Sequence, residues 1–330
     1  MQGEAAVRRY VLILFPSFIA FVLLGSPAKA QSPGWDYQPY RIRAVVALDL
    51  PGGIAEQTAD ALPVYLQRRV VAAIGPVWSF NVELATGAVR QHILADLATL
   101  PDTPPTDFPL DNIDKLVLVA VHGQPDGYSL VAREYDTFVQ RWGTPIRRKT
   151  RQDEALPEHV FAILCQTVAP IAQFELAAND EKHVVLKPRG AALFRTNSGE
   201  SWTRPGEVFL PIFRRTTRGG QLVEKGIQVV PWTFLQVIEG EDQSTTAQIL
   251  SGTRRPFGIR RQGRVEQVAI ALRSDPGDTV LNVHSRVAAD KPLVGREVYA
   301  LADPKKPNEL VRIGSTDRAG TLEKPTGKRR

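Results

Sequence analysis

The chain has 330 residues, a formal net charge of +6, 43% hydrophobic residues and 23% charged residues. This composition is typical of a globular protein and excludes a wholly disordered chain. The single cysteine, Cys165, excludes an internal disulfide and lies in the apolar run 160–165, which predicts a buried structural thiol. The roughly 300 residues after the N-terminal segment suffice for two or three domains of about 100–150 residues each.

The first thirty residues have the order of a secretory signal peptide. Arg8-Arg9 forms a positive n-region, residues 11–24 are almost entirely apolar, and Ala28-Lys29-Ala30 matches an A-x-A cleavage site before Gln31. As a helix, the apolar run would be about 21 Å long, short of the ~30 Å core of a bilayer. We therefore expect cleavage between Ala30 and Gln31 and a mature chain in the periplasm or outside the cell. An uncleaved membrane anchor is the alternative.

Charge is distributed unevenly along the rest of the chain. Residues 31–200 carry a net charge of −4, residues 201–273 carry +5, and residues 274–330 carry +3. The change of sign predicts a domain boundary near residue 200. The basic second half favours anionic partners such as acidic polysaccharide or lipid head groups. Because the chain is expected to be exported, nucleic acid is not an expected partner.

Residues 31–200 are predicted to form an α+β domain. Strands are expected at 40–48, 78–84, 116–121, 128–133, 171–176 and 183–186, and helices at 55–74, 88–100 and 150–168. In the first of these helices, Pro63 predicts a break or a helix that begins at Leu62. Hairpin-forming turns at 123–127 and 179–182 argue against a doubly wound nucleotide-binding fold, in which helices separate the strands. The prediction is an α/β sandwich with hairpins. The basic run 147–151 is interpreted as a linker.

Residues 201–330 are predicted to be all-β. Short β-rich runs occur at 206–213, 228–237, 247–250, 265–272, 279–284 and 296–300. Gly, Asp and Pro separate them at the spacing of small barrels and sandwiches. We expect a basic β-rich module over 201–273 and a partial β-sandwich with a basic tail over 274–330. Trp78 and Trp232 lie in apolar strand patterns and are predicted to be core residues.

The last domain carries a family resemblance. The segments 279–283, 293–300 and 314–321, the last with the turn Thr316-Asp317-Arg318-Ala319-Gly320, resemble the front half of a carboxypeptidase-regulatory-like or collagen-adhesin B-type sandwich. The resemblance covers about fifty residues and implies an Ig-like or prealbumin-like β-sandwich. The chain as a whole is similar to uncharacterised bacterial exported proteins, a resemblance that supplies no activity.

The sandwich is expected to be incomplete. Domains of that family continue with an apolar strand after the turn, whereas residues 323–330 of this chain are mostly charged. The chain is therefore predicted to end inside its final domain, as a truncated gene product or as a half-sandwich that a partner completes. An unpaired edge recruits a further strand or aggregates, so an oligomer formed through this edge is one of the two expected outcomes.

Catalytic motifs are absent from the sequence: it contains no H-E-x-x-H, G-x-S-x-G, P-loop or C-x-x-C. The five histidines are far apart, so no local pair could bind a metal ion. We therefore predict no catalytic residues, no metal and no cofactor. The alternative is an exported hydrolase whose catalytic residues are dispersed over the α+β half and meet only in space.

Two arginine clusters are the candidate anion-binding residues, because guanidinium groups bind phosphate, sulfate and carboxylate in a bidentate manner. They consist of Arg254, Arg255, Arg260, Arg261 and Arg264, and of Arg214, Arg215 and Arg218. Solvated loops are the alternative interpretation of both. The sequence thus predicts an exported, non-catalytic envelope protein with a binding or assembly role. Its expected partners are an acidic polysaccharide, lipid head groups or an envelope protein.

Overall fold

The computed structural model describes residues 34–330 apart from several short segments. The segments outside the description are 50–53, 55, 102–103, 105–107, 153, 178–179, 194–202, 241–243, 259–263, 275–279, 286, 289, 302–308 and 324–330. The predicted signal peptide, with Ala30 and Gln31, lies outside the described residues, as do Arg260 and Arg261. Within the described residues, no helix has both the length and the apolar character needed to span a bilayer.

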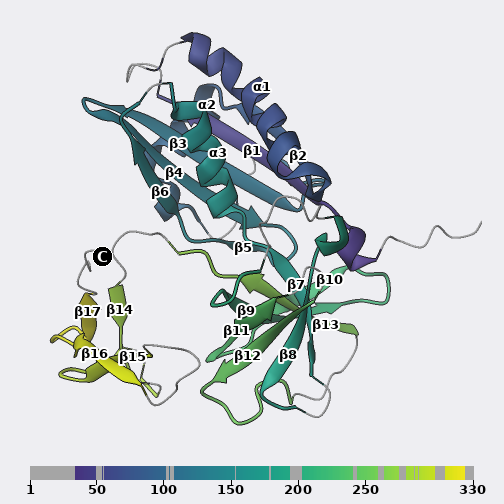
Figure 1. Ribbon diagram of the computed structural model, residues 1–330, viewed down its shortest axis with the longest axis vertical. Helices are drawn as coiled ribbons and strands as arrows, with labels where there is room; N and C mark the ends of the chain where they lie inside the picture. Colours follow the sequence, from purple (N-terminus) through teal and green to yellow (C-terminus); the bar gives the residue numbers. More distant parts are fainter. Residues whose placement is uncertain are drawn as a thin grey trace, which may run out of the picture. The chain divides into compact units, whose positions relative to one another are not determined.

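The first part of the described chain is a six-stranded mixed sheet with the order β2-β1-β3-β4-β5, in which β6 also pairs with β4 (Figure 1). Its strands are β1 (Tyr40–Leu48), β2 (Trp78–Leu84), β3 (Lys115–Gln124), β4 (Gly127–Asp136), β5 (Arg141–Trp142) and β6 (Ile146–Thr150). Strand β1 runs parallel to β2 and β3. The remaining pairings are antiparallel.

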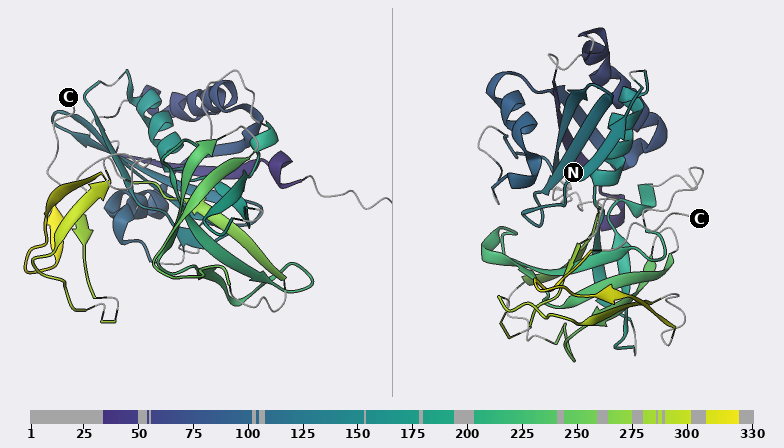
Figure 2. Two further views of the ribbon diagram at one scale, coloured as in Figure 1. Left: turned by 60° about the horizontal axis from the view of Figure 1, so that its bottom comes forward. Right: turned by 90° about the vertical axis from the view of Figure 1, so that its left-hand side faces the viewer.

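Helices cover both faces of this sheet (Figure 2). They are α1 (Glu56–Ala73), α2 (Gly87–Ala95) and α3 (Leu156–Thr167), with short 3-10 turns at Trp35–Tyr37, Gly75–Val77, Leu97–Thr99 and Ala191–Leu193. Leu66 of α1 and Leu164 of α3 pack into one core with Val46, whereas Ile93 of α2 packs with Val45 in another. Successive residues of β1 thus face two different cores, and this explains its continuous apolar sequence.

The second part is an antiparallel barrel. Strands β9-β11-β12-β8-β7-β13 pair in that order and β13 pairs back to β9, which closes the barrel, while β10 adds to β9. The strands are β7 (Ile171–Leu176), β8 (His183–Pro188), β9 (Val208–Thr216), β10 (Leu222–Val229), β11 (Thr233–Gly240), β12 (Thr245–Ser251) and β13 (Arg264–Ala271). The described chain is therefore mostly β, with an α/β layer preceding the barrel.

Two sequence-based expectations differ from this topology. Strands β7 and β8 belong to the barrel, so the predicted boundary near residue 200 falls inside the barrel. The pairing of Val268 with Gln173 and of Ala247 with Val184 joins residues far apart in sequence, which a local strand pattern cannot reveal. The basic run 147–151, expected as a linker, mostly lies in β6, where only the end residues of the strand are buried.

The C-terminal residues form two separate two-stranded sheets. Strand β14 (Val280–Asn282) pairs with β17 (Thr321–Glu323), and β15 (Glu297–Leu301) pairs with β16 (Leu310–Ser315). The turn expected at 316–320 is present: the Asp317 carboxylate accepts hydrogen bonds from the backbone N–H groups of Ala319 and Thr321, each at 2.8 Å. Among the described residues, neither pair is extended by a third strand.

A buried ion cluster lies where the mixed sheet leads into the barrel. Lys115, at the start of β3, is fully buried, and its Nζ donates to Glu134 Oε1 at 2.6 Å and to Asp136 Oδ2 at 2.7 Å. Burial alone would lower the pKa of Lys115, but the carboxylates of Asp136 and Glu134 outweigh this and raise it. The lysine therefore stays charged and offsets one of the two carboxylates on β4, while burial raises the pKa of Glu134 from its ordinary value.

The second carboxylate oxygens of the cluster bind backbone groups beyond β4. Glu134 Oε2 accepts a hydrogen bond at 2.7 Å from the N–H of Ala169, two residues before β7. Asp136 Oδ1 accepts from the N–H groups of Phe138 and Val139, both at 2.9 Å. Because every buried oxygen has a donor, the cluster avoids the cost of an unsatisfied buried charge and holds the first barrel strand against the sheet.

Tyr40 makes a second connection at the same place. Its hydroxyl donates to the carbonyl of Ile171 at 3.2 Å and accepts from the N–H of Ile171 at 2.9 Å. Burial raises the pKa of Tyr40 to about 12. The Lys115 Nζ lies 5.4 Å from the centroid of the Tyr40 ring, and the Arg189 guanidinium lies 5.1 Å from it. Both cations are therefore within the range of a cation–π interaction with this ring.

Replacing Lys115 by Met should strongly destabilise the protein, because Glu134 and Asp136 would then face each other in the interior without a counter-charge. We expect a loss of about 3–5 kcal/mol in the free energy of unfolding, measured by urea unfolding followed by circular dichroism. The matched control is Arg69→Met, which breaks an exposed ion pair with Glu158 and should cost less than about 1 kcal/mol. Equal losses for the two variants would contradict the structural role of the cluster.

Candidate binding surface

An open groove of about 970 Å³ lies between the barrel and the α/β layer, because Ile146 of β6 and Gln166 of α3 line it together with barrel residues. Its exposed apolar side chains include Phe234 of β11, Leu250 of β12 and Leu272, which follows β13. Phe234 and Leu250 are directly opposite in register, so their side chains share one face of the sheet. These three side chains are between 40% and 45% exposed. Apolar groups that reach solvent at one place are typical of interaction sites.

The polar wall of the groove is held by an ion pair. Arg273 donates to Glu207 Oε1 at 3.1 Å and, through Nε, to the carbonyl of Val168 at 3.4 Å. The N–H of Leu272 donates to the carbonyl of Val208 at 2.8 Å. These contacts fix the positions of Leu272 and Arg273, so this wall of the groove is part of the folded structure.

Trp232 is exposed, and its prediction as a core residue is wrong. The side chain is 58% exposed, and the residue has a φ of 57° in the turn between β10 and β11. A bulky residue in the left-handed region is a conformational outlier. The expected single strand over 228–237 is two strands, because the chain turns at Pro231-Trp232. The carbonyl of Trp232 accepts a hydrogen bond from the N–H of Gly252 at 2.8 Å.

The first arginine cluster lies in the loop that links β12 to β13. Arg254 and Arg255 are exposed, and Arg264 is exposed at the start of β13. Phe257 is buried in the same loop, with ring centroids 5.0 Å from Phe174 and 6.4 Å from Phe213. The buried ring attaches this loop to the barrel core while the arginines face solvent. Arg260 and Arg261, the other two members, lie outside the described residues.

The second arginine cluster divides into structural and exposed members. Arg214 pairs with Glu266 at 2.8 Å and lies 4.2 Å above the ring of Phe138, so its charge is already engaged. Arg215 is exposed and donates to the neutral Gln228 at 3.4 Å, and Arg218 is exposed in the β9–β10 turn. The sequence pattern does not separate these roles, because the three residues lie within five positions of one another.

The barrel topology brings the exposed arginines of both clusters to the same end. Arg264 pairs in register with Thr216, which adjoins Arg215. Phe257, in the loop with Arg254, contacts Phe213 near the same end of β9. The β9–β10 turn with Arg218 follows Thr216. Among the described residues, none of these exposed arginines forms a salt bridge with an acidic side chain. The exposed members are Arg215, Arg218, Arg254, Arg255 and Arg264.

Two of the described histidines, His159 and His183, have hydrogen-bond partners. No group of three or more potential metal ligands occurs in the described part of the chain. His159 Nδ1 accepts a hydrogen bond from Arg148 Nε at 2.8 Å, and His183 Nδ1 lies 2.6 Å from Asp180 Oδ2. Neither pair includes a nucleophilic hydroxyl or thiol, so neither has the arrangement of a hydrolytic triad.

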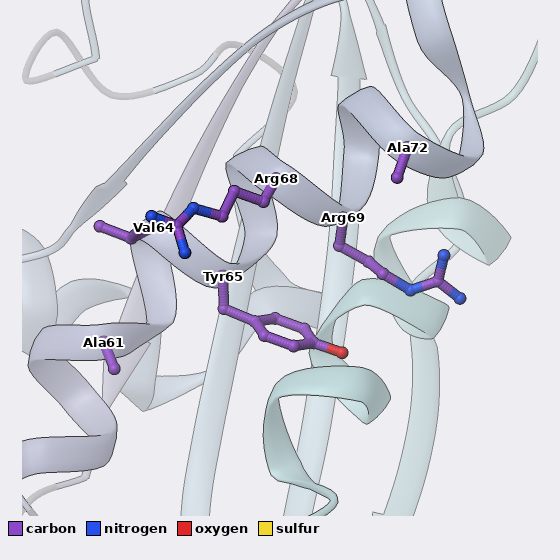
Figure 3. A pocket seen from close by; sticks show the side chains of 6 residues that line it. All are labelled: Ala61, Val64, Tyr65, Arg68, Arg69 and Ala72. Atoms are coloured by element: carbon purple, nitrogen blue, oxygen red, sulfur yellow. The ribbon is translucent and has the colours of Figure 1, made fainter.

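A second hollow, of about 670 Å³, follows the outer face of α1 (Figure 3). Its polar contacts are directed toward α3: the Tyr65 hydroxyl and the Arg69 guanidinium both donate to the carboxylate of Glu158. Arg69 also lies 4.6 Å above the ring of Phe161. These contacts join two helices, and the hollow is lined by residues of α1 alone, so the barrel offers the better candidate surface.

The apolar part of the barrel surface was missed by sequence reasoning. Phe234 and Leu250 lie in alternating strand patterns that look like core strands, and their exposure follows from barrel closure. Pro231 just before Trp232 was the available signal, because proline favours turns. It would have placed Trp232 outside a strand.

Comparisons with known proteins do not assign this chain to a family. No family model matches the chain, and no curated protein matches it. Among solved structures, the chain is similar to TolB from Acinetobacter baumannii with 9% sequence identity and a TM-score of 0.25, over 87% of this chain and 71% of that one. A likeness at this level indicates neither the fold nor the function of the present chain.

The contact between His159 and Arg148 should make stability depend on pH. Burial, followed by the Arg148 charge, lowers the pKa of His159 from its ordinary value, so the unfolded chain binds this proton more readily. The contribution of neutral His159 to the free energy of unfolding is complete above its pKa in the unfolded chain, about 6.5. This contribution is lost as the pH falls below that value toward the lowered pKa of the folded state. We expect the melting temperature to fall between pH 7.5 and pH 5.5, and to fall less in His159→Gln, which accepts the same hydrogen bond without titrating.

Differential scanning fluorimetry of both proteins across this pH range measures the difference. His92, for which no comparable contact is present, offers the control variant His92→Gln, which should follow the wild type. If His159→Gln and the wild type lose stability in parallel, the His159–Arg148 contact does not contribute to the pH dependence.

Proposed function

We propose that this protein is an exported, non-catalytic envelope protein with a binding or assembly role, and that its barrel contacts an anionic polymer or surface. The observation that carries the proposal is the set of exposed arginines at one end of the barrel, which have no acidic partner among the described residues. Guanidinium groups in this situation remain available for phosphate, sulfate or carboxylate. Their combined positive potential also attracts anions over longer distances.

The contrast with the interior supports the proposal. Lys115, Arg189 and Arg214 each contact a carboxylate, so the charges within the fold are compensated. The exposed arginines of the barrel end, in contrast, have no acidic partner among the described residues. These arginines come from two loops that are separate in sequence, and the fold brings both loops to one end of the barrel. This convergence supports a binding role for the arginines.

Export and assembly are further parts of the proposal. The order of the first thirty residues supports secretion into the periplasm or beyond the cell, where an acidic polysaccharide, lipid head groups or an envelope protein would be the partner. The turn at 316–320 and the two short C-terminal sheets are consistent with an incomplete Ig-like or prealbumin-like sandwich. Exposed apolar residues on those sheets, such as Leu281 and Tyr299, would support oligomerisation through an edge strand.

N-terminal sequencing tests the export part of the proposal. Protein recovered from the cell envelope should begin at Gln31, because the n-region, the apolar run and the A-x-A site precede that residue in the expected order. Replacing Ala28 and Ala30 by bulky residues should block processing and leave a longer chain. An intact Met1 to Ala30 segment on the wild-type protein would contradict cleavage.

Neutralising the exposed arginines should weaken binding to an acidic polymer such as dextran sulfate. For Arg215, Arg218, Arg254, Arg255 and Arg264 changed together to Gln, we expect at least roughly tenfold weaker binding at low salt. The slope of log affinity against log salt concentration should also flatten, because fewer counterions are released. Isothermal titration at several salt concentrations provides both quantities.

The control variant changes Arg68 and Arg151, two exposed arginines of the α/β part, to Gln and should bind like the wild type. Unchanged binding by the five-residue variant would leave the solvated-loop interpretation standing. Equal weakening in both variants would show only a dependence on net charge.

A further inference from the structure

The barrel surface has an apolar part directly beside its arginines. Trp232 is 58% exposed, and Phe234 and Leu250 are 41% and 40% exposed. Phe234 pairs with Leu250, and the next register pair along the hairpin is Thr233 with Ser251. The chain then bends at Gly252, whose N–H donates to the carbonyl of Trp232 at 2.8 Å.

This bend connects the apolar side chains to the basic loop. The Thr233 and Ser251 hydroxyls lie 2.8 Å apart, and the Ser251 hydroxyl accepts a hydrogen bond from the N–H of Thr253 at 3.1 Å. Arg254 and Arg255 follow immediately and are exposed. One end of the β11–β12 hairpin therefore carries an indole in the turn before β11 and two groove-lining apolar side chains on the strands. Two guanidinium groups follow in the hydrogen-bonded segment after β12.

We propose that this hairpin end binds the surface of an anionic phospholipid bilayer, with Arg254 and Arg255 against lipid phosphates and Trp232, Phe234 and Leu250 in the interfacial layer. The inference rests on the proposed function, because it names the anionic surface that the basic barrel end contacts. Tryptophan favours the interface between head groups and acyl chains. Nearby arginines contribute attraction to anionic lipids in addition to the buried apolar area.

The other anionic partners fit the hairpin end less well. An acidic polysaccharide would engage the arginines but would offer no apolar layer for three exposed hydrophobic side chains. A peptide adding as an extra strand needs a free strand edge, whereas β11 pairs with both β9 and β12, and β12 pairs with both β11 and β8. A bilayer interface supplies both the charge and the apolar layer.

The test uses protein exported by a bacterial host and recovered in its processed form. Co-sedimentation is measured with vesicles of phosphatidylcholine alone and of phosphatidylcholine mixed with phosphatidylglycerol. The variant W232S/F234S/L250S should bind the anionic vesicles about tenfold more weakly and should bind dextran sulfate like the wild type. The variant R254Q/R255Q should bind both more weakly, by about tenfold for the vesicles.

A matched apolar control changes Val64 and Val71 to Ser, since these α1 side chains are 53% and 63% exposed but lie outside the barrel. This variant should bind the anionic vesicles like the wild type. Circular dichroism and melting temperature identify any variant that has not folded, and single substitutions of Trp232 and Phe234 to Ser then replace the triple variant.

The outcomes separate this inference from the proposed function. Vesicle binding that is unaffected by W232S/F234S/L250S, or that is equal for neutral and anionic vesicles, would overturn the bilayer inference and leave polymer binding intact. Binding to dextran sulfate but to neither vesicle would also overturn it and would assign the apolar side chains to a protein partner. Binding to neither dextran sulfate nor vesicles would contradict both the inference and the proposed function.

Discussion

A positive charge buried at the start of β3 determines how the two halves of this protein join. Lys115 is fully buried, and a lysine in that position is tolerable only with anionic partners. Glu134 and Asp136 supply them from the adjacent strand. Each carboxylate then uses its remaining oxygen for backbone N–H groups, those of Ala169 before the first barrel strand and of the turn after β4. Tyr40 adds a paired hydrogen bond to Ile171, so the start of the barrel is held from two positions.

This arrangement separates the interior charges from those available for function. The paired ions of the interior fix the α/β layer and the first barrel strand through the contacts of Glu134 with Lys115 and with the N–H of Ala169. The barrel, held in this way, places the exposed arginines and the apolar hairpin end on its outside. The buried charges thus contribute to stability and the exposed ones to binding. Substitutions of one set should leave the contribution of the other set unchanged.

Much of the local structure could be predicted from the sequence, and the long-range pairing could not. The strand expected at 78–84 is β2, and the α/β character of the first part follows from its alternation of strands and helices. The hairpin turn at Pro125-Asp126 sets the register of β3 and β4, and this register places Asp136 opposite Lys115. The sequence alone does not indicate that Lys115 is buried, because the residue stands just before an apolar strand. By contrast, β7 and β8 pair with strands more than fifty residues away, and no local pattern identifies such partners.

The candidate surface was predicted in its charged half only. Runs of arginine are visible in the sequence. Strand pairing and loop geometry decide that Arg214 pairs with Glu266, whereas Arg254 has no acidic partner among the described residues. The exposure of Trp232 and Phe234 depends on a turn at Pro231 and on the curvature of a closed barrel. Apolar alternation alone indicates that a side chain is on one face of a strand, and it does not indicate whether that face is covered.

Hydrogen–deuterium exchange with and without dextran sulfate tests the central claim most directly, because it locates the contact along the whole chain without any substitution. The account predicts slower exchange at 251–258 and 214–221, at the basic end of the barrel, and unchanged exchange across α1 and α3. Slower exchange confined to α1 and α3, or no change at polymer concentrations where binding is complete, would contradict the assignment of binding to the barrel.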